Sequence, residues 1–462
     1  MRKETKSKPV SPYLLVILSF IGVIVFGSFL LTLPWAHQNG QWGRYIDALF
    51  TATSATCVTG LCTYANGIGQ ELTLFGQIVV LIMIKIGGLG FITILTFFVS
   101  LIQKKLQFKD RYMLAQAVNS SSVADVGKFV RRVIIIVTSC EVLGFLLGLP
   151  VFLNVKQYST GEAVWASLFT SISAFNNAGF DIFGSSSLIR GDAAFVNPII
   201  NSMPEWAYNY MLVYIMVLIV LGGLSFVTII ELTFHHKKVR QLSSFTRITL
   251  VMTGTLLVFG FVAFLLTDVT NGNISIVNAL FQSVTTRTAG FSTFNQANLS
   301  PAGSTISCLL MFIGGSPIGT AGGIKTTTIF ILVLCLIRFL QGKRVSAFKR
   351  EFTNSSIVKT MTVVFLAIVL ITLGYITIAS FEQGNKAASS DNIFFETFSA
   401  FGTVGLSCNL TPTLSVGSKI IICMLMFFGR LGPITLFQIF QIKVDNEKST
   451  HYREVPTDVI IG

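Results

Sequence analysis

The sequence predicts an all-α integral membrane protein in which four similar repeats surround a pore with approximate fourfold symmetry. Three observations support this fold class. Only 11% of the 462 residues are charged, whereas soluble domains carry about 25%. Several apolar runs reach about 20 residues, which is enough to cross a bilayer. A short segment that ends in glycine occurs four times, and its glycines (Gly60, Gly179, Gly290 and Gly405) stand 119, 111 and 115 residues apart.

Composition excludes several other classes of protein. Hydrophobic residues make up 52% of the chain, which excludes a disordered protein and an ordinary soluble enzyme. The seven cysteines are odd in number, form no Cys-x-x-Cys motif and mostly lie in apolar runs. We therefore expect small buried side chains rather than metal ligands. With four histidines and no paired carboxylates in the spans, neither enzymatic activity nor an organic cofactor is expected.

Eight segments are predicted to span the membrane as helices. Six are continuous apolar runs, and two are interrupted by glycine or polar residues. The first run is longer than the apolar core of a signal peptide and is followed by no small-residue cleavage site, so we expect it to be retained. The continuous runs cover residues 13–33, 133–153, 211–230, 250–267, 361–380 and 420–440, and the interrupted ones cover residues 72–101 and 306–340.

Basic residues indicate the orientation of these spans. Of the 33 Lys and Arg residues, 24 fall in segments that an eight-span arrangement places in the cytoplasm, and five fall in outer loops. This bias predicts a multi-pass protein of the cell membrane with both termini cytoplasmic. The net charge of +13 therefore reflects topology, and no nucleic-acid partner is expected. The outer loops carry ten acidic residues, Asp181 among them, which would concentrate cations at the outer mouth.

Each repeat has the same order of elements. A full span comes first, a short stretch that ends in the glycine segment follows, and a second span returns to the cytoplasmic side. In the first repeat, the stretch at residues 45–56 is too short to span. It must enter from outside and turn back, which is tolerated only inside protein or beside a water-filled cavity. The repeats cover residues 1–110, 111–240, 241–350 and 351–462.

The glycine segments have the chemistry of a cation filter. Glycine permits backbone angles that other residues cannot hold, so successive carbonyl groups can point at a common axis. Rings of such carbonyl oxygens replace the hydration shell of a monovalent cation. No carboxylate cage is expected in the membrane, which disfavours a divalent cation. The candidate filter residues are Cys57, Val58, Thr59, Gly60, Asn176, Asn177, Ala178, Gly179, Arg287, Thr288, Ala289, Gly290, Gly402, Thr403, Val404 and Gly405.

The second span of each repeat contains a glycine-rich break, and the third break is the longest. Its five glycines, one proline and small polar residues cannot form a stable helix at mid-membrane. This span is therefore predicted to be two helices joined by a loop, residues 314–328, that faces the cavity. The spacing does not match a phosphate-binding loop. The candidate loop residues are Gly314, Gly315, Ser316, Pro317, Gly319, Thr320, Ala321, Gly322, Gly323 and Lys325.

Five charged residues are expected at membrane depth. Arg430 takes the place of the second glycine in the fourth break, and a buried Arg in a span is usually functional. Lys325 either extends toward the cytoplasm or holds the loop. We expect Arg287 to anchor its segment to a neighbouring acid. Lys85 is expected at a helix interface or reaching toward the surface, and Glu141 is expected to pair with a basic or polar group between helices.

Together these motifs resemble the Trk/Ktr/HKT superfamily of potassium transporters. Thr403-Val-Gly405 is similar to a shortened potassium-channel filter, and one glycine per segment is the pattern of the superfamily. The resemblance covers residues 13–441, and the length is closest to the Ktr-type membrane subunit. It implies K+ as the transported ion, with a potassium preference from the four glycines. It also implies that the loop at 314–328 obstructs ion flow and that Arg430 forms an electrostatic barrier.

The resemblance also implies partners. Ktr-type subunits form homodimers in the lipid bilayer and sit on a cytosolic ring of nucleotide-binding regulatory subunits, for which residues 104–132 and 338–359 offer basic docking surfaces. Sodium dependence is a trait of the family and implies Na+ as an activating ion. The alternative is a secondary cation transporter with broken helices, which predicts two inverted halves rather than four parallel repeats.

Overall fold

The computed structural model of the protein describes residues 12–90, 126–184, 187–191, 197–234, 241–348 and 350–432. The fold is mainly helical, as the sequence predicts, with one short antiparallel hairpin. Several expectations lie outside the described residues. They are the first cytoplasmic segment, residues 104–125 of the basic loop, residues 91–101 and 433–440 of two spans, and the C-terminal tail.

The helices of the first half form two groups. The first group is α1 (Pro12–Thr32), η1 (Pro34–Ala36), α2 (Tyr45–Cys57), α3 (Ile68–Glu71) and α4 (Leu74–Leu89). The second group is α7 (Val126–Leu153), α8 (Thr160–Phe175), α9 (Pro198–Asn201), α10 (Glu205–Gly223) and α11 (Phe226–Phe234).

The second half forms two further groups. The third group is α12 (Ser244–Phe264), η3 (Leu265–Val269), α13 (Ile276–Thr285), η4 (Gln296–Asn298), α14 (Pro301–Phe312) and α15 (Thr326–Leu340), followed by the hairpin of β1 (Ser346–Ala347) and β2 (Arg350–Glu351). The fourth group is α16 (Asn354–Phe381), α17 (Ser390–Gly402), η5 (Thr411–Thr413) and α18 (Val416–Leu431).

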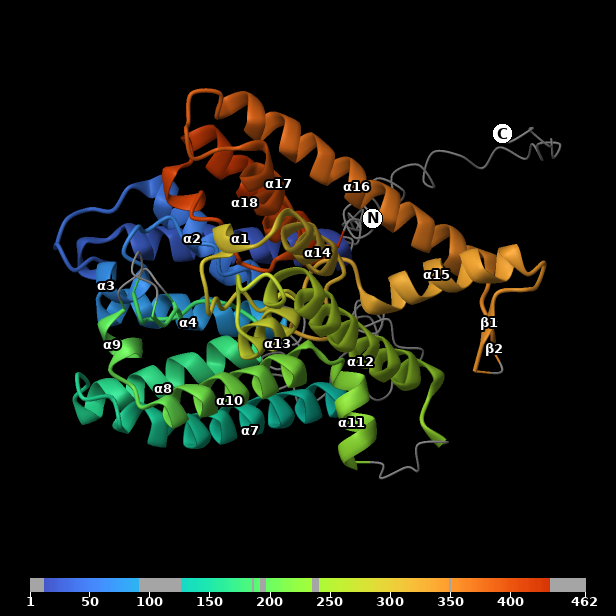
Figure 1. The fold of residues 1–462 in the computed structure, drawn as a ribbon, viewed down its shortest axis with the longest axis horizontal. Coiled ribbons are helices and arrows are strands. Elements are labelled where there is room, and N and C mark those ends of the chain that lie inside the picture. The colour runs from blue at the N-terminus through green and yellow to red at the C-terminus, as the bar shows by residue number, and fades with distance from the viewer. Residues whose placement is uncertain are drawn as a thin grey trace, which may run out of the picture.

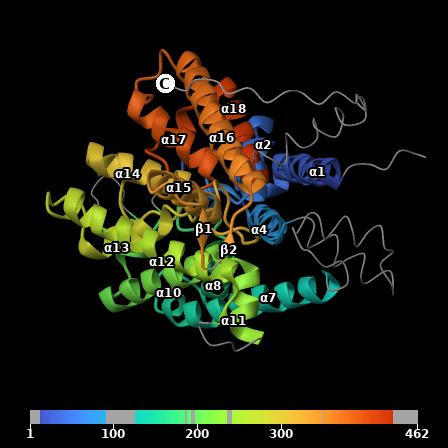
Figure 2. The same ribbon diagram turned by 90° about the vertical axis from the view of Figure 1, so that its right-hand side faces the viewer.

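The four groups surround a common centre. Figure 1 shows many of the helices lying side by side along the long axis of the molecule. In Figure 2, turned by 90°, the blue, green, yellow and orange-red groups occupy four sides of the molecule, and α15 lies in front of the centre. The short helices α2, α8, α13 and α17, one in each group, are the elements that precede the four glycine segments.

Four helices within the described residues are long and apolar enough to cross a membrane. They are Gly127–Leu153, Glu205–Gly223, Ser244–Val269 and Asn354–Phe381. Shorter apolar helices cover Val16–Thr32, Leu74–Leu89, Ile276–Thr285, Pro301–Phe312 and Thr326–Leu340. The predicted break in the second span of the third group lies between α14 and α15, and a second break separates α10 from α11.

Hydroxyl side chains fix where several of these helices begin. Three of the four short helices start after a serine whose side chain accepts from a backbone amide of the first turn. At Ser159 the cap is reciprocal, because Glu162 also accepts from the Ser159 amide. Such caps satisfy amide groups that the helix itself leaves unpaired. They therefore set the start of the helix and, through its length, the position of the glycine segment at its other end.

Small residues bring the first helix of a group close to its short helix. A Cβ atom at Gly148 of α7 would lie 2.8 Å from the Ser167 hydroxyl of α8. In the third group, a Cβ atom at Gly260 of α12 would lie 2.5 Å from the Ser283 hydroxyl of α13. In membranes, where apolar burial does not distinguish protein from lipid, close backbone packing of this kind is the main source of helix association.

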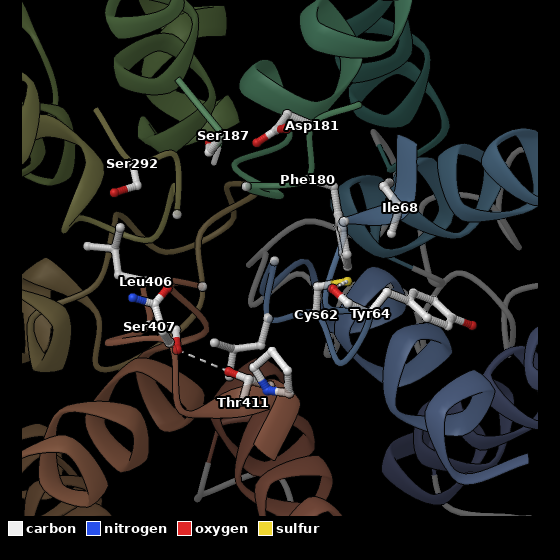
Figure 3. A pocket seen from close by; sticks show the side chains of 18 of the residues that line it. Cys62, Tyr64, Ile68, Phe180, Asp181, Ser187, Ser292, Leu406, Ser407 and Thr411 are labelled. Carbon is white, nitrogen blue, oxygen red and sulfur yellow. Dashed lines mark hydrogen bonds between the residues drawn. The ribbon is translucent and has the colours of Figure 1, made fainter. Parts of the chain in front are cut away.

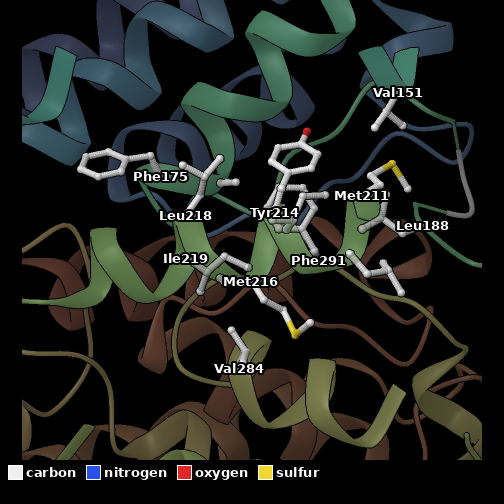
Figure 4. Close-up of a cluster of buried hydrophobic side chains, with 14 of the residues drawn as sticks. Val151, Phe175, Leu188, Met211, Tyr214, Met216, Leu218, Ile219, Val284 and Phe291 are labelled. Carbon is white, nitrogen blue, oxygen red and sulfur yellow. The ribbon is translucent and has the colours of Figure 1, made fainter. Parts of the chain in front are cut away.

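A large apolar cluster joins the second group to the third (Figure 4). Phe175 at the end of α8 and Phe291 after the third glycine segment are both fully buried in it. Figure 4 shows Phe175 beside Leu218 of α10, and Phe291 belongs to the same cluster. Bulky apolar side chains therefore pack around the residues that flank the second and third glycine segments.

Candidate functional site

The four predicted glycines meet in a ring, in sequence order. A Cβ atom at Gly60 would lie 2.6 Å from the carbonyl oxygen of Ala178, and one at Gly179 would lie 2.6 Å from that of Ala289. Gly290 faces the carbonyl of Val404 in the same way, and Gly405 faces that of Thr59, which closes the ring. Each glycine thus contacts the residue that precedes the next glycine, and no side chain fits at any of the four positions.

All four segments share an unusual backbone. The φ angles of the glycines are positive, from 68° at Gly179 to 102° at Gly60. The residue two positions earlier is also left-handed in every segment: Val58 (58°), Asn177 (57°), Thr288 (73°) and Thr403 (51°). In a regular strand successive residues face opposite sides, whereas alternate left-handed residues turn the peptide planes so that successive carbonyls can face one side. A positive φ at a β-branched residue such as Val58 is strained and usually marks a functional segment.

Hydroxyl groups at the end of each short helix anchor the glycine segment that follows. In the first and fourth segments, Ser54 and Ser399 accept from the amides of Gly60 and Gly405 at 3.0 and 3.1 Å. In the second and third, Ser173 and Thr285 donate to the carbonyl after the glycine, at 2.6 and 2.7 Å. Sequence analysis did not single out these residues. The available signal was a serine six positions before the glycine in three of the four segments.

A cavity of about 380 Å³ opens on the side of the ring where the chain leaves the glycines. Figure 3 shows Tyr64, Asp181, Ser407 and Thr411 among its lining residues. Burial raises the pKa of Asp181 to about 6, although the Ser187 hydroxyl and the amide of Phe183 favour its ionised form. The cavity therefore holds a carboxylate at neutral pH, which would attract cations.

The loop between α14 and α15 lies against the opposite side of the ring. A Cβ atom at Gly323 would lie 3.3 Å from the carbonyl of Gly402, and Gly322 faces the side chain of Thr403. The hydroxyl of Thr320 donates to Gly222 at 2.8 Å and to Phe175, at the end of α8, at 3.4 Å. The predicted loop and the predicted filter segments are thus in direct contact.

The backbone of this loop is paired with the break between α10 and α11. The amide of Ser316 donates to the carbonyl of Gly223 at 3.0 Å, and the amide of Phe226 donates to that of Ile318 at 2.9 Å. Pro317 and Gly319 lie in the same stretch, where a Cβ atom at Gly319 would meet the carbonyl of Leu224 at 2.7 Å. Non-helical backbone at membrane depth requires such partners. Lys325 donates to Ala321 at 2.6 Å and so holds the loop from within.

Arg430 joins the loop to two helices. One guanidinium nitrogen donates to the carbonyl of Thr320 in the loop, and the other donates to that of Gly87 in the last turn of α4. Carbonyl groups in the last turn of a helix carry partial negative charge, which favours a nearby cation, and that of Gly87 also accepts from the amide of Gly90 at 3.3 Å. The side chain therefore fixes the loop relative to α4 and places a positive charge below the ring.

Glycines in the predicted breaks lie against the ends of the short helices. Gly87, Gly222 and Gly429 face the carbonyls of Thr56, Phe175 and Phe401, respectively, where a Cβ atom would collide. Each carbonyl belongs to the residue four positions before a ring glycine. In the third group, Gly314 instead faces Gly322 of its own loop. The breaks are thus the points at which the second helix of a group supports its glycine segment.

Arg287, one of the candidate filter residues, lies behind the third segment rather than in the ring. Its guanidinium is buried and donates to the backbone carbonyl of Thr253 in α12 at 3.3 Å. The expected partner was a neighbouring acid, and no ion pair of Arg287 is present in the described residues. The side chain still anchors the segment, but to the helix backbone.

The sequence is similar to those of known cation transport proteins. Residues 3–452 match the TrkH model, described as cation transport protein. The potassium/sodium uptake protein NtpJ of Enterococcus hirae is 33% identical, covering 100% of this chain and 99% of that protein. The Ktr system potassium uptake protein B of Bacillus subtilis is 34% identical, covering 96% of this chain and 95% of that protein.

A solved structure has the same fold. The crystal structure of the potassium transporter TrkH from Vibrio parahaemolyticus covers 98% of this chain and 88% of its own with a TM-score of 0.69. Sequence identity to that protein is 17%, so this likeness concerns the fold alone.

Proposed function

The chain belongs to the TrkH family of cation transport proteins, which are membrane-embedded transporters rather than enzymes, and we propose that it carries potassium into the cell through a pore. The ring formed by Gly60, Gly179, Gly290 and Gly405 carries the proposal. Relatives about one-third identical over their full length are named potassium uptake proteins. Carbonyl groups that converge on one axis provide the ligands that a dehydrated K+ ion needs.

The proposed architecture has eight spans in four repeats, residues 1–110, 111–240, 241–350 and 351–462, with both termini in the cytoplasm. Four helices of spanning length and the recurring order of long helix, short helix and glycine segment support it. In this orientation the cavity with Asp181 is the outer mouth. The ion loses water at the ring, and the four filter segments are residues 57–60, 176–179, 287–290 and 402–405.

The proposed gate is the loop of residues 314–328 together with Arg430. Contacts of Gly322 and Gly323 with the fourth segment support a position directly in the path of the ion. The Arg430 guanidinium adds a positive charge there, which opposes the passage of a cation. Ion flux then requires the loop to move, which breaks the hydrogen bonds from Thr320 of the loop to α8 and α10. A membrane potential of 100 mV contributes about 2.3 kcal/mol per charge toward entry.

The proposed assembly is a homodimer in the cell membrane on a cytosolic ring of nucleotide-binding regulatory subunits. Two relatives are named components of a Ktr system, and such a system implies further subunits. Within the described residues, the hairpin of β1 and β2 with exposed Arg344 and Arg350 supports a basic surface after α15. The name of the Enterococcus relative, potassium/sodium uptake protein, supports Na+ as a second ion.

A secondary cation transporter is the rival. The breaks between α10 and α11 and between α14 and α15 favour it, because discontinuous helices build the binding sites of such transporters. Such a site relies on two halves, whereas the glycine ring draws equally on four segments. The two mechanisms differ in rate and in their dependence on a coupling ion, and therefore uptake kinetics distinguish them.

The test is rubidium and potassium uptake in a bacterial strain that lacks its own high-affinity uptake systems. The chain is expressed alone and then with a candidate cytosolic regulator, and membrane insertion is verified by fractionation. Saturable uptake that prefers K+ over Na+ is the expected result, and it should rise with the regulator. No uptake by verified membrane-inserted protein would reject the proposed pore. Uptake in which a second cation is carried into the cell together with each K+ ion would favour the rival.

A further inference from the structure

An ion pair that is buried at its acidic end joins the first two groups of helices next to the ring. Lys85 of α4 binds a carboxylate oxygen of Glu141 in α7. The contact confirms the expectation that Glu141 pairs with a base between helices, and the Glu141 side chain is 7% exposed whereas that of Lys85 is 30% exposed. A buried pair of this kind contributes little net stability, because desolvation offsets the attraction between the charges. Its contacts, rather than its strength, indicate what it does.

The second carboxylate oxygen of Glu141 holds Asn176. It accepts from the Asn176 side-chain amide at 2.9 Å, and that amide also donates to Ile172 at 2.8 Å. Asn176 is fully buried, and its amide oxygen lies against Gly88 of α4, where a Cβ atom would collide. The side chain is thus fixed from α7, α8 and α4 at once.

Asn176 is the first residue of the second filter segment, so its position bears directly on the ring. Two residues later, the carbonyl of Ala178 faces Gly60. The corresponding residues of the other segments are Cys57, Arg287 and Gly402. Arg287 reaches back to the first helix of its own group, as Asn176 does, but it contacts a backbone carbonyl. Of these four residues, Asn176 is the one whose side chain donates a hydrogen bond to a carboxylate in the described structure.

The same part of α4 is held from its other side by the gate. Gly87 accepts from Arg430, while its neighbour Gly88 contacts Asn176 and Lys85 lies two residues earlier. Movement of Arg430 with the loop would therefore shift the helix that carries both Lys85 and Gly88. The ion pair thus lies within one turn of α4 from the Arg430 contact.

We infer that Glu141, held by Lys85, is a positioning residue that sets the second filter segment through Asn176 and thereby contributes to the choice of K+ over Na+. The inference rests on the proposed function. A carboxylate acceptor makes a stronger and more directional bond than a neutral one, and selectivity depends on where the filter carbonyls lie. If the pair only joined two helices, its replacement by matched apolar side chains would leave selectivity unchanged.

The decisive variant is Lys85→Met with Glu141→Leu, which removes the pair without burying a lone charge. Purified protein is first checked for folding by size exclusion and by its melting temperature. Uptake of Rb+ is then measured in competition with K+ and with Na+. We expect the K+/Na+ preference to fall about tenfold, the size expected for the loss of one charge-assisted hydrogen bond, while uptake itself continues. The graded comparison, Lys85→Met with Glu141→Gln, keeps a neutral and therefore weaker acceptor for Asn176, and its loss of preference should be about two- to threefold, smaller than that of the apolar variant.

Asn176→Ala provides an independent test that leaves the ion pair in place. It should lower the K+/Na+ preference as the apolar double variant does, and it decides the question if that variant does not fold. An unchanged preference in either folded variant overturns the inference, while wild-type uptake still supports the pore. If the wild-type protein itself does not take up K+, the proposed function fails and the inference fails with it.

Discussion

Lys419 donates to Asp47 at 2.7 Å and so joins α18, the last helix of the fourth group, to α2 of the first group. The two residues are 372 positions apart in the sequence. Their side chains are only 9% and 15% exposed. The contact joins the fourth group of helices to the first and so closes the circle of groups. Within the ring, the backbone contact of Gly405 with Thr59 joins the same two groups.

Loss of one partner of the Lys419–Asp47 ion pair should destabilise the protein more than loss of both. Lys419→Met leaves Asp47 buried without its base and should lower the free energy of unfolding by about 3 kcal/mol. Lys419→Met combined with Asp47→Leu should recover most of that loss, because no buried charge is left alone. Thermal unfolding of purified protein in detergent measures both. Glu351→Ala removes the partner of an exposed pair with Arg344 and serves as the control, with no measurable shift expected. Equal losses in the single and double variants would contradict the prediction.

The glycine ring should tolerate no side chain. In Gly290→Asp the new Cβ atom would collide with the carbonyl of Val404 and approach Gly179 and Gly405 at 3.2 Å. We expect Rb+ uptake to fall by more than about tenfold in correctly inserted protein, since displacing a carbonyl of the proposed filter changes the coordination of the ion.

The control for this variant is Gly342→Asp. Gly342 has a similar positive φ of 61°, but a Cβ atom added there would meet no other atom within 4 Å. The backbone strain is therefore comparable and only the collision differs. Near-wild-type uptake in Gly290→Asp would remove the filter interpretation, and loss of uptake in Gly342→Asp would point to backbone strain instead.

The sequence predicted the parts of the site that depend on the absence of a side chain. Gly60, Gly179, Gly290 and Gly405 could be found from their spacing, because backbone contact in a ring leaves no room for a Cβ atom and so restricts the residue type. The break in the helix before Lys325 could also be predicted from residue types. Glycine and proline cannot sustain a helix there, and the chain ends α14 at Phe312.

Contacts made by backbone carbonyls could not be predicted in this way. Arg430 was expected to be a functional charge, but its partners, the carbonyls of Thr320 and Gly87, carry no signature in residue type. Arg287 similarly bonds to a carbonyl where an acid was expected. Every residue except proline presents the same donor and acceptor on its backbone, and therefore only the folded arrangement identifies which carbonyl is used.

Removal of the Arg430 guanidinium should loosen the proposed gate. Arg430→Ala deletes two hydrogen bonds that tie the loop to α18 and α4, together with the positive charge below the ring. Each charge-assisted hydrogen bond contributes about 1.5–3 kcal/mol, so we expect Rb+ flux without a regulator to rise about tenfold or more. Tracer flux into liposomes that contain the purified protein measures this directly.

Two further variants separate charge from geometry at this position. Arg430→Lys keeps the positive charge but cannot reach both carbonyls with a planar fork, and its flux should fall between those of the wild type and Arg430→Ala. Arg344→Ala removes a charge that is 85% exposed and should leave flux unchanged. Wild-type flux and regulation in Arg430→Ala would assign Arg430 a purely structural role.

Uptake should depend on external pH through Asp181. Burial raises the pKa of this carboxyl to about 6, so the cavity gains a negative charge as the pH rises from 5 to 7. A charge several ångströms from the ion in a water-filled mouth contributes about 0.5–1 kcal/mol, which predicts an increase in K+ uptake of about two- to fivefold over that range at low K+ concentration. Asp181→Asn should lose most of this pH dependence and should transport close to the rate that the wild type shows at pH 5. Glu162→Gln is the matched control, because hydrogen bonds from Ser159 lower the pKa of Glu162 and keep it ionised throughout. A pH step that persists in Asp181→Asn would show that another group senses the proton.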